Sequence, residues 1–508
     1  MFSFPLLTTI VFLPLAGALG MLICWRNDLW CRRMTLSVMM ADLLLAISLF
    51  TLNAHQGTAG FPSGWLRIED FTWIPAFGIR FTLALDGISL MLILLTAVLG
   101  ILAVLISWKA VTQHVAAFHF FLLTMQTGVL GVFLSTDILL FYLFWEAQTI
   151  PMFFLIGIWG HDRRIYATIK FALFTIAGSL LMLAALLSLY LLHGRQSGHY
   201  TFSLLQLTST TFSSPVELLL FAAFTIAFAI KVPLVPVHTW LPDAHTEAPT
   251  AGSVILAGIL LKTGAYALLR FAFPLFPDAA RFFTPWLICL GLAGVFYAGW
   301  IALAQKDVKR LVAYSSISHM GLIIVGLAAW NLTSLSGSLL QMINHGVTTS
   351  ALFILIGMLD ERLHIRQLSD MGGLWKTIPV WSAFFLFFTL ASLGLPGLNN
   401  FVGEILILAG TFSAWPWAAV IGFFGLLWTV VFSLRMLHES LWGEPGTLRP
   451  PNIPDLTLRE LIILAPLCMA VFWLGLHPGP VLDILQNSVS GLLTHNGRLA
   501  ALAPSALP

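Results

Sequence analysis

The chain has 508 residues, of which 59% are hydrophobic and only 9% are charged, and its mean hydropathy is +0.93. This composition excludes an ordinary soluble globular domain. The formal net charge of +2 does not indicate nucleic acid as a partner, because the basic residues lie mostly in the loops between apolar segments.

Long apolar segments follow one another along the whole chain. A membrane-spanning helix needs roughly 20 mostly apolar residues, and the sequence holds about fourteen such segments. We expect them near 4–24, 33–52, 83–107, 115–134, 137–159, 166–192, 216–240, 250–272, 284–305, 311–330, 334–358, 378–411, 415–438 and 459–478. The sequence therefore predicts an all-α polytopic protein of the lipid bilayer, with a single membrane domain over residues 1–508.

The basic residues predict an orientation in the membrane. Arg26, Arg32 and Arg33 follow the first segment, and the same side collects most of the later Lys and Arg residues. Cytoplasmic loops are enriched in Lys and Arg, so we expect both termini outside.

Three regions between or after the segments differ from short loops. The outer segment 53–82 contains "GWLRIEDFTWIPAFGIRFT", which reads as short strands or a hairpin. The inner loop 440–458 is polar and rich in proline. The C-terminal residues 479–508 are expected to form an outer tail that lies loosely on the surface.

Two apolar segments contain helix breakers in or just beyond their middle. These are "FAIKVPLVPVHTWLPDAHTEAPT" (228–250) in the seventh segment and "LASLGLPGLNNFVGEILIL" (390–408) in the twelfth. Such paired interruptions predict a transport site near the bilayer midplane and two inverted five-helix repeats, helices 4–8 (115–272) and 9–13 (284–438), with helices 7 and 12 broken. The alternative is that the prolines only kink membrane helices.

Four charged residues are expected deep in the membrane. Glu146 and Lys262 lie near the middle of their segments, Lys231 is expected well inside helix 7, and Glu404 follows the break in helix 12. Each such charge costs about 2.5–3.5 kcal/mol on insertion scales. The alternative is a structural ion pair that locks two helices. Two acids and two lysines at this depth, without an arginine, favour titratable groups that carry protons.

Histidines are further candidates for proton transfer. His319 and His345 are expected in the middle of helices and His238 at the inner end of helix 7. For each of them a hydrogen-bonded core residue is the alternative to a relay. Asp243 and His245 are expected in the following inner loop, where they line an entrance or make a turn.

The sequence contains no recognisable binding motif for a redox cofactor. Its cysteines are scattered and form no Cys-x-x-Cys pair, and we find no Gly-x-Gly-x-x-Gly after a strand and no phosphate-binding loop. The cysteines are best explained as small buried residues; they are Cys24, Cys31, Cys289 and Cys468. We therefore expect this chain to bind no cofactor and no metal.

Four stretches together resemble a known family. They are "FAIKVPLVPVHTWLPDAHTEAPTAGSVILAGILLKTGAYALLR", "FWEAQTIPMFFLIGIWG", "AYSSISHMG" and "LPGLNNFVGE". These stretches resemble the antiporter-like subunits of respiratory complex I, and the resemblance covers about residues 83–440. An acidic residue at the position of Glu404 resembles the M-type subunits of this family. The sister subunits of the L and N types have lysine in that region.

The resemblance implies roles for the candidate residues. Glu146 would be the acid paired with Lys231, Lys262 the central site, and Glu404 the terminal site. The chain would be a non-redox, proton-translocating subunit of NADH:quinone oxidoreductase in the bacterial inner membrane. It would lie beside L- and N-type neighbours, with FMN, iron–sulfur clusters and quinone in partner subunits.

Other functions fit parts of the same sequence. A subunit of a multisubunit cation/proton antiporter, or of a membrane-bound hydrogenase, would share the motifs of helices 7 and 8. A membrane haem carrier would use paired histidines instead. A structural spacer would use the buried charges only to lock helices.

Overall fold

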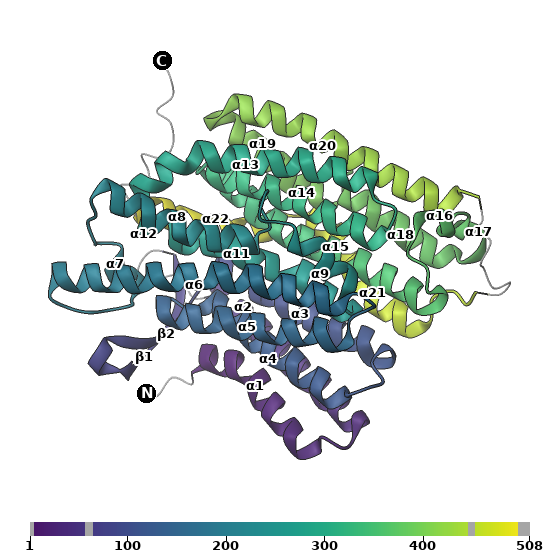
Figure 1. The fold of residues 1–508 in the computed structure, drawn as a ribbon, viewed down its shortest axis with the longest axis horizontal. Coiled ribbons are helices and arrows are strands. Elements are labelled where there is room, and N and C mark those ends of the chain that lie inside the picture. The colour runs from purple at the N-terminus through teal and green to yellow at the C-terminus, as the bar shows by residue number, and fades with distance from the viewer. Residues whose placement is uncertain (1–4, 56–63, 445–452, 496–508) are drawn as a thin grey trace.

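The computed structural model describes residues 5–55, 64–444 and 453–495, which form a bundle of long helices with one small sheet (Figure 1). The elements are, in chain order, α1 Leu6–Cys24, α2 Asp28–His55, β1 Trp65–Ile74, η1 Pro75–Phe77, β2 Ile79–Asp86, α3 Gly87–Ala110, α4 Val115–Leu134, α5 Ile138–Trp159, α6 Arg164–Ser197, α7 Leu204–Leu207, α8 Ser214–Lys231, α9 Trp240–Glu247, α10 Thr250–Ile255, η2 Leu256–Leu260, α11 Leu261–Ala267, η3 Leu268–Ala272, α12 Phe273–Leu275, α13 Pro277–Ala304, α14 Val308–Ala328, α15 Leu332–Leu363, α16 Leu368–Met371, α17 Leu374–Thr377, α18 Pro379–Ser392, α19 Asn399–Ala414, α20 Pro416–Leu437, η4 His438–Trp442, α21 Leu458–Leu476 and α22 Gly479–His495.

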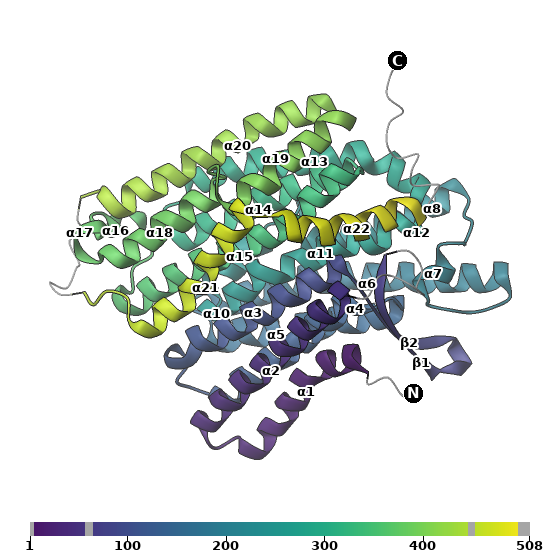
Figure 2. The ribbon, with the colours of Figure 1, turned by 180° about the vertical axis from the view of Figure 1, so that it is seen from behind.

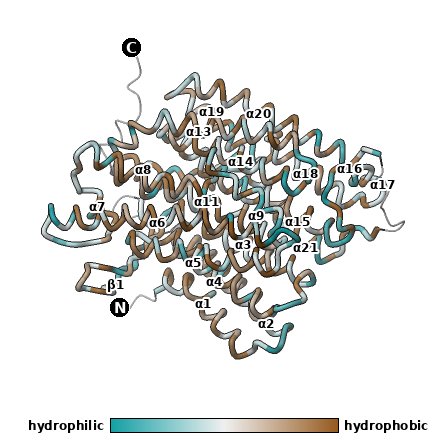
Figure 3. The backbone as a smooth tube through the Cα atoms, viewed as in Figure 1, coloured by the Kyte–Doolittle hydropathy of each residue, from teal (hydrophilic) through white to brown (hydrophobic). Residues whose placement is uncertain are grey.

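Membrane-spanning helices account for most of the described residues. Within the described ranges, thirteen helices are long and apolar enough to cross a membrane, or up to fourteen if the bent pair Leu368–Thr377 and Pro379–Ser392 counts as one span. Hydrophobic residues run along the helices, and hydrophilic residues gather more often at their ends (Figure 3). The predicted polytopic helical fold is therefore confirmed.

The segment before α3 folds as the expected hairpin. β1 and β2 pair antiparallel, and aromatic and β-branched side chains favour this extended backbone. Gly78 closes the turn at φ 65°, a left-handed conformation that glycine adopts without strain. Across the pair, hydrogen bonds from Arg80 hold the pKa of Asp70 below its usual value. We call this end of the bundle the hairpin side.

Two fully buried helices carry Lys262 and His345. The continuous span α10–α12 and helix α15 are buried over the whole of their apolar windows. By contrast, α2 and α21 are buried over only 28% and 33% of theirs, so much of their apolar surface lies on the outside of the bundle. A helix that is apolar on all sides is typical of the interior of a membrane bundle.

Both predicted helix breaks are present. The seventh span ends at Lys231 and resumes as α9 at Trp240, and the twelfth ends at Ser392 and resumes as α19 at Asn399. The pairing of 115–272 and 284–438 as inverted repeats stays a prediction.

The chain after Gly479 is not a loose tail. Residues up to His495 form α22, which crosses the back of the bundle against α3 and α15 (Figure 2, yellow). The expectation failed because Val481, Leu485 and Val489 recur every four residues and bury one face of the helix. Residues 496–508 lie outside the described residues, as do 445–452 of the predicted inner loop.

A glycine contact sets the distance between α13 and α14. A Cβ at Gly291 would lie 2.7 Å from the carbonyl oxygen of Gly321 and would push the helices apart. We expect Gly291→Ala to lower stability by about 1–3 kcal/mol, the usual cost of overpacking. The fraction that stays monodisperse after heating, followed by size exclusion in mild detergent, measures this.

Gly479→Ala is the control, because its added Cβ would meet no atom within 4 Å. Equal heat resistance of the two variants would contradict close packing at Gly291.

Candidate functional site

Lys231 occupies the C-terminal end of α8. The helix stops there because Pro233 has no N–H to continue the hydrogen-bond ladder. The predicted break therefore follows Lys231 directly, and the lysine ends the first half of the broken helix 7. A helix C-terminus carries the negative pole of the helix dipole, which favours a cation. The break thus gives the buried ammonium group, 2% exposed, a favourable position.

The direct partner of Lys231 is a hydroxyl rather than a carboxylate. Its Nζ donates to Thr149 Oγ1 at 2.7 Å and lies 5.2 Å from the centre of the Trp145 ring. Among the described residues, no ion pair within 4.0 Å joins Glu146 to Lys231, and Glu146 Oε1 is buried without a hydrogen-bond partner. Glu146 acts on Lys231 only as a charge at longer range. The pairing of Glu146 with Lys231 that the resemblance implies is therefore not a direct contact in this structure.

The orientation of α5 explains this separation. Leu143 and Ile150, one turn before and after Glu146, are 43% and 54% exposed. Glu146 lies between this exposed face and the buried face of the helix, and its side chain is half-buried. Thr149 is on the inward face, with 6% exposure.

An amide connects α5 to the next lysine-bearing helix. Gln148 Nε2 donates to Thr263 Oγ1 at 3.4 Å, and Thr263 is the neighbour of Lys262 in the chain. Both side chains are fully buried. Polar side chains therefore lead from the Lys231 region toward Lys262.

Lys262 is enclosed completely by protein. Its Nζ donates to the carbonyl oxygen of Ala257 and lies 2.7 Å from His345 Nδ1. Ala257 belongs to the π-helical turn η2, and α11 is followed by a second such turn, η3. π-Helical turns change the regular bonding of a helix and often occur at functional sites. Here the turn presents a backbone acceptor to a lysine five residues later.

Two histidines continue from Lys262 to a carboxylate. The rings of His345 and His319 have centroids 5.5 Å apart. His319 Nδ1 lies 3.5 Å from Glu404 Oε1, which also accepts from Gln341 Nε2 at 3.3 Å. The helices that supply these groups, α11, α14, α15 and α19, pack together in the middle of the bundle (Figure 1).

The break before α19 shapes the site of Glu404. Gly394 has φ 78°, and a Cβ there would lie 3.3 Å from Glu404 Cδ. The site therefore needs glycine both for backbone conformation and for space.

The remaining candidate histidines, His238 and His245, lie outside the series from Lys262 to Glu404. His238 is buried between α8 and α9 and packs edge-on against Tyr297, with ring centroids 5.3 Å apart, so no contact links it to Lys262 or His345. His245 belongs to helix α9 instead of a loop, and it stacks on Phe353. Asp243 on the same helix pairs with Lys170 at 2.7 Å.

The sequence did not lead us to predict the neutral polar residues of this site. Thr149, Gln148, Thr263 and Gln341 hold or connect the charged groups, yet threonine and glutamine are ordinary in membrane helices. Their spacing was the available signal: Gln148 and Thr149 follow Glu146 by two and three residues, and Thr263 follows Lys262 directly.

The arrangement suits proton transfer within the membrane. Lysine, histidine and glutamate all exchange a proton, and Lys262, His345, His319 and Glu404 come in this order from four different helices. Among the described residues, no group of three or more His, Cys, Asp or Glu side chains is placed to hold a metal ion.

Comparison with known sequences identifies relatives along the full length. Residues 135–429 match the family model described as "NADH:quinone oxidoreductase/Mrp antiporter, TM". The chain is 44% identical over 499 residues to NADH-quinone oxidoreductase subunit M of Escherichia coli K12, covering 96% of this chain and 97% of that protein. It is 38% identical over 482 residues to NADH-ubiquinone oxidoreductase chain 4 of Chondrus crispus, covering 94% and 96%.

Solved structures share the fold. A chain of respiratory complex I from Thermus thermophilus with bound NADH matches with TM-score 0.84 and 30% identity, covering 96% of this chain and 99% of that one. A chain of the Mrp complex from Dietzia sp. DQ12-45-1b, at 18% identity, covers 98% and 100% with TM-score 0.84 and shows the fold alone. The resemblance found in the sequence is thus confirmed: the chain belongs to the NADH:quinone oxidoreductase/Mrp antiporter membrane-subunit family.

Proposed function

We propose that this chain is a proton-translocating membrane subunit of NADH:quinone oxidoreductase, the M-type subunit of respiratory complex I. The observation that carries the proposal is the buried series Lys262–His345–His319–Glu404, in which each group contacts or faces the next. Each titratable group in such a series takes up a proton from one neighbour and gives one to the next, and so returns to its starting state.

The central step is transfer from Lys262 to His345. The ammonium gives its proton to Nδ1 of the imidazole, which leaves a neutral amine and an imidazolium. His345 then passes a proton to His319, and His319 passes one to the Glu404 carboxylate. Glu404 is the terminal site of this chain, linked to the outside or to the next subunit.

Lys231 and Glu146 control the entry to this series. Thr149 holds the Lys231 ammonium, while the Glu146 charge acts on it without contact. An opposite charge nearby favours the charged form of a lysine. A change in the field at Glu146, caused by electron transfer in partner subunits, therefore decides when Lys231 releases its proton toward Lys262.

Redox chemistry belongs to the partners in this proposal. FMN, iron–sulfur clusters and quinone are bound by other subunits, and L- and N-type subunits are the membrane neighbours. The chain lies in the bacterial inner membrane with both termini outside, as the distribution of Lys and Arg predicts.

Replacement of His345 tests the relay. We expect His345→Gln to slow NADH-driven proton pumping of the assembled complex by about a hundredfold, because a positioned proton-transfer group contributes at least this much. Electron transfer and vesicle acidification are measured together, and complex abundance in the membrane is the folding control. His199→Gln, at an exposed position, is the matched control. Normal pumping by an intact His345→Gln complex would contradict proton transfer through His345.

Replacement of Glu146 tests control at a distance. At an effective dielectric constant of 20, a unit charge beyond contact distance contributes on the order of 1–2 kcal/mol, which is roughly tenfold in an equilibrium. We therefore expect Glu146→Gln to reduce coupled pumping by roughly tenfold. Glu439→Gln removes a glutamate charge on the surface and is the control.

An unchanged proton-to-electron ratio and an unchanged rate of quinone reduction in the Glu146→Gln complex would show that this charge has no part in coupling. Co-purification with flavin and iron–sulfur subunits separates the proposal from a cation/proton antiporter, and a nickel enzyme among the partners would indicate a hydrogenase.

A further inference from the structure

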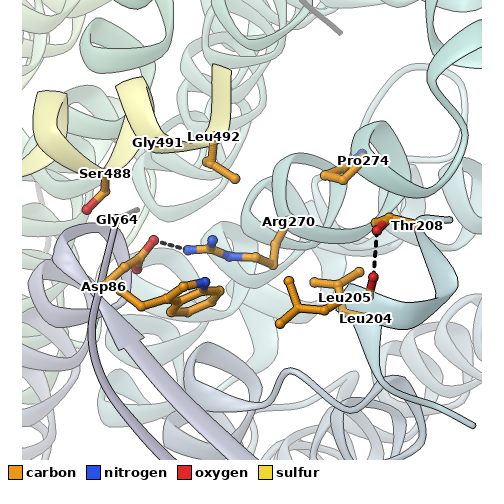
Figure 4. Close-up of a pocket in the computed structure, with 11 residues that line it drawn as sticks. Gly64, Asp86, Leu204, Leu205, Thr208, Arg270, Pro274, Ser488, Gly491 and Leu492 are labelled. Carbon is orange, nitrogen blue, oxygen red and sulfur yellow. Dashed lines mark hydrogen bonds and ion pairs between the residues drawn. The ribbon is translucent and has the colours of Figure 1, made fainter. Parts of the chain in front are cut away.

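A buried ion pair lies on the hairpin side, away from the series from Lys262 to Glu404. Arg270 Nη2 donates to Asp86, whose Oδ1 also caps α3 by accepting the backbone N–H of Ser89 at 2.8 Å. The pair borders a cavity of about 230 Å³, with α22 on one side and Leu204 and Leu205 on the other (Figure 4). These contacts hold η3 against the start of α3, so the pair links two elements outside the series.

A second buried polar link joins two helices of the series itself. Asn344 Nδ2 on α15 donates to the backbone carbonyl of Asn399 at 2.7 Å, and Asn399 Nδ2 on α19 donates to the carbonyl of Asn344 at 3.1 Å. The Thr348 hydroxyl accepts from Asn399 Nδ2 at 3.1 Å. All three residues are at most 1% exposed. The link lies close to the relay, because Asn344 directly precedes His345 and Asn399 begins α19, five residues before Glu404.

The start of α19 depends on such side-chain contacts because α18 does not continue into it. Helix α18 ends at Ser392, and Gly394 and Gly397 in the connection have φ values of 78° and 92°. This left-handed backbone interrupts a regular right-handed helix. Asn400 Nδ2 donates across the break to the carbonyl of Ser392 at 3.3 Å. Amide side chains therefore connect α19 both to α18 and to α15.

Helices α15 and α19 pack closely and antiparallel. A Cβ at Gly337 would lie 2.7 Å from the backbone nitrogen of Ile407, and one turn further along α15, Gln341 donates to Glu404 at 3.3 Å. Small residues let membrane helices approach each other, whereas a buried asparagine fixes the register of packed helices. A slide of one residue would move Glu404 by about 1.5 Å. It would separate Glu404 Oε1 from His319 Nδ1, which are 3.5 Å apart.

The asparagine pair adds geometry more than stability. Among the described residues, Asn344 Oδ1 is buried without a hydrogen-bond partner. A buried acceptor that is left unsatisfied costs about as much free energy as one hydrogen bond contributes. Apolar contacts would join the two helices without this cost, but they would not fix the register.

We propose that Asn344 and Asn399 form a register clamp, a pair of positioning residues that hold Glu404 at His319 for the last proton transfer of the series. In that transfer, Nδ1 of the His319 imidazolium gives its proton to the Glu404 carboxylate, which leaves a neutral imidazole and a carboxylic acid. The amides themselves carry no proton, because their role is to donate and accept hydrogen bonds. The clamp rests on the proposed function, since it acts through Glu404.

The double variant Asn344→Ala with Asn399→Ala is the main test. Each side chain bonds the backbone of the other residue, so a single substitution leaves one of the two bonds in place. In the assembled complex in sealed vesicles we expect the double variant to slow NADH-driven acidification by roughly tenfold, because a misplacement of about 1 Å costs up to about a hundredfold. Each single variant should lie between the wild type and the double variant.

We expect normal complex abundance, because Asn331 Nδ2 still donates to the Gly410 carbonyl at 2.7 Å and anchors the other end of α19. Thr411→Val is the matched control. It removes a buried hydroxyl from the same helix, and this hydroxyl has no hydrogen-bond partner within the described ranges.

The ratio of the acidification rates in H₂O and D₂O separates positioning from packing. A misplaced Glu404 makes proton transfer limit the rate, and a deuteron transfers more slowly than a proton. We therefore expect the ratio to rise in the double variant and to keep its wild-type value in Thr411→Val. Equal ratios in the two variants would overturn the clamp, and so would a loss of complex abundance with normal pumping per remaining complex.

Glu404→Gln distinguishes the two levels of inference. If an intact complex with this variant pumps normally, the proposed function itself fails. If it stops pumping while the double asparagine variant pumps like Thr411→Val, only the clamp fails.

Discussion

Every buried charge in this bundle must find its partner within the protein, because the surrounding lipid offers none. Lys262 shows how the fold meets this constraint: the π-helical turn η2 presents the carbonyl of Ala257, and α15 supplies His345. The central span thus supplies one partner of Lys262 from its own backbone, and a neighbouring helix supplies the other.

The two broken helices place buried charges of opposite sign near their helix ends. Lys231 ends α8, where the negative pole of the helix favours a cation. Glu404 lies in the second turn of α19, near the positive pole, which favours a carboxylate with a smaller effect at that distance. The polarity of the helix ends thus matches lysine to the first break and an acid to the second, and Gly394 supplies the space for the carboxylate.

Sequence patterns predicted the parts of this structure that depend on composition and on helix breakers. The apolar runs, the hairpin, both breaks and the depth of Lys262 follow from hydrophobic length and from proline or glycine positions. The rotation of α5 did not follow, because helix packing sets it, and so Thr149 was not predicted as the direct partner of Lys231. The amphipathic face of α22 was missed because its small and polar residues resemble those of a tail.

The separation of Glu146 from Lys231 suits a switch better than a contact would. A buried, hydrogen-bonded ion pair is costly to open, because each partner would be left unpaired in a low-dielectric interior. A charge at longer range, by contrast, changes the proton equilibrium of a lysine by about an order of magnitude and can be altered without breaking a bond. Thr149 meanwhile keeps the Lys231 ammonium in place, since a neutral hydroxyl holds the group without fixing its charge. In the proposed mechanism, position and protonation are therefore governed by different residues on the same helix, and this division would let a distant redox event act through the field at Glu146 alone.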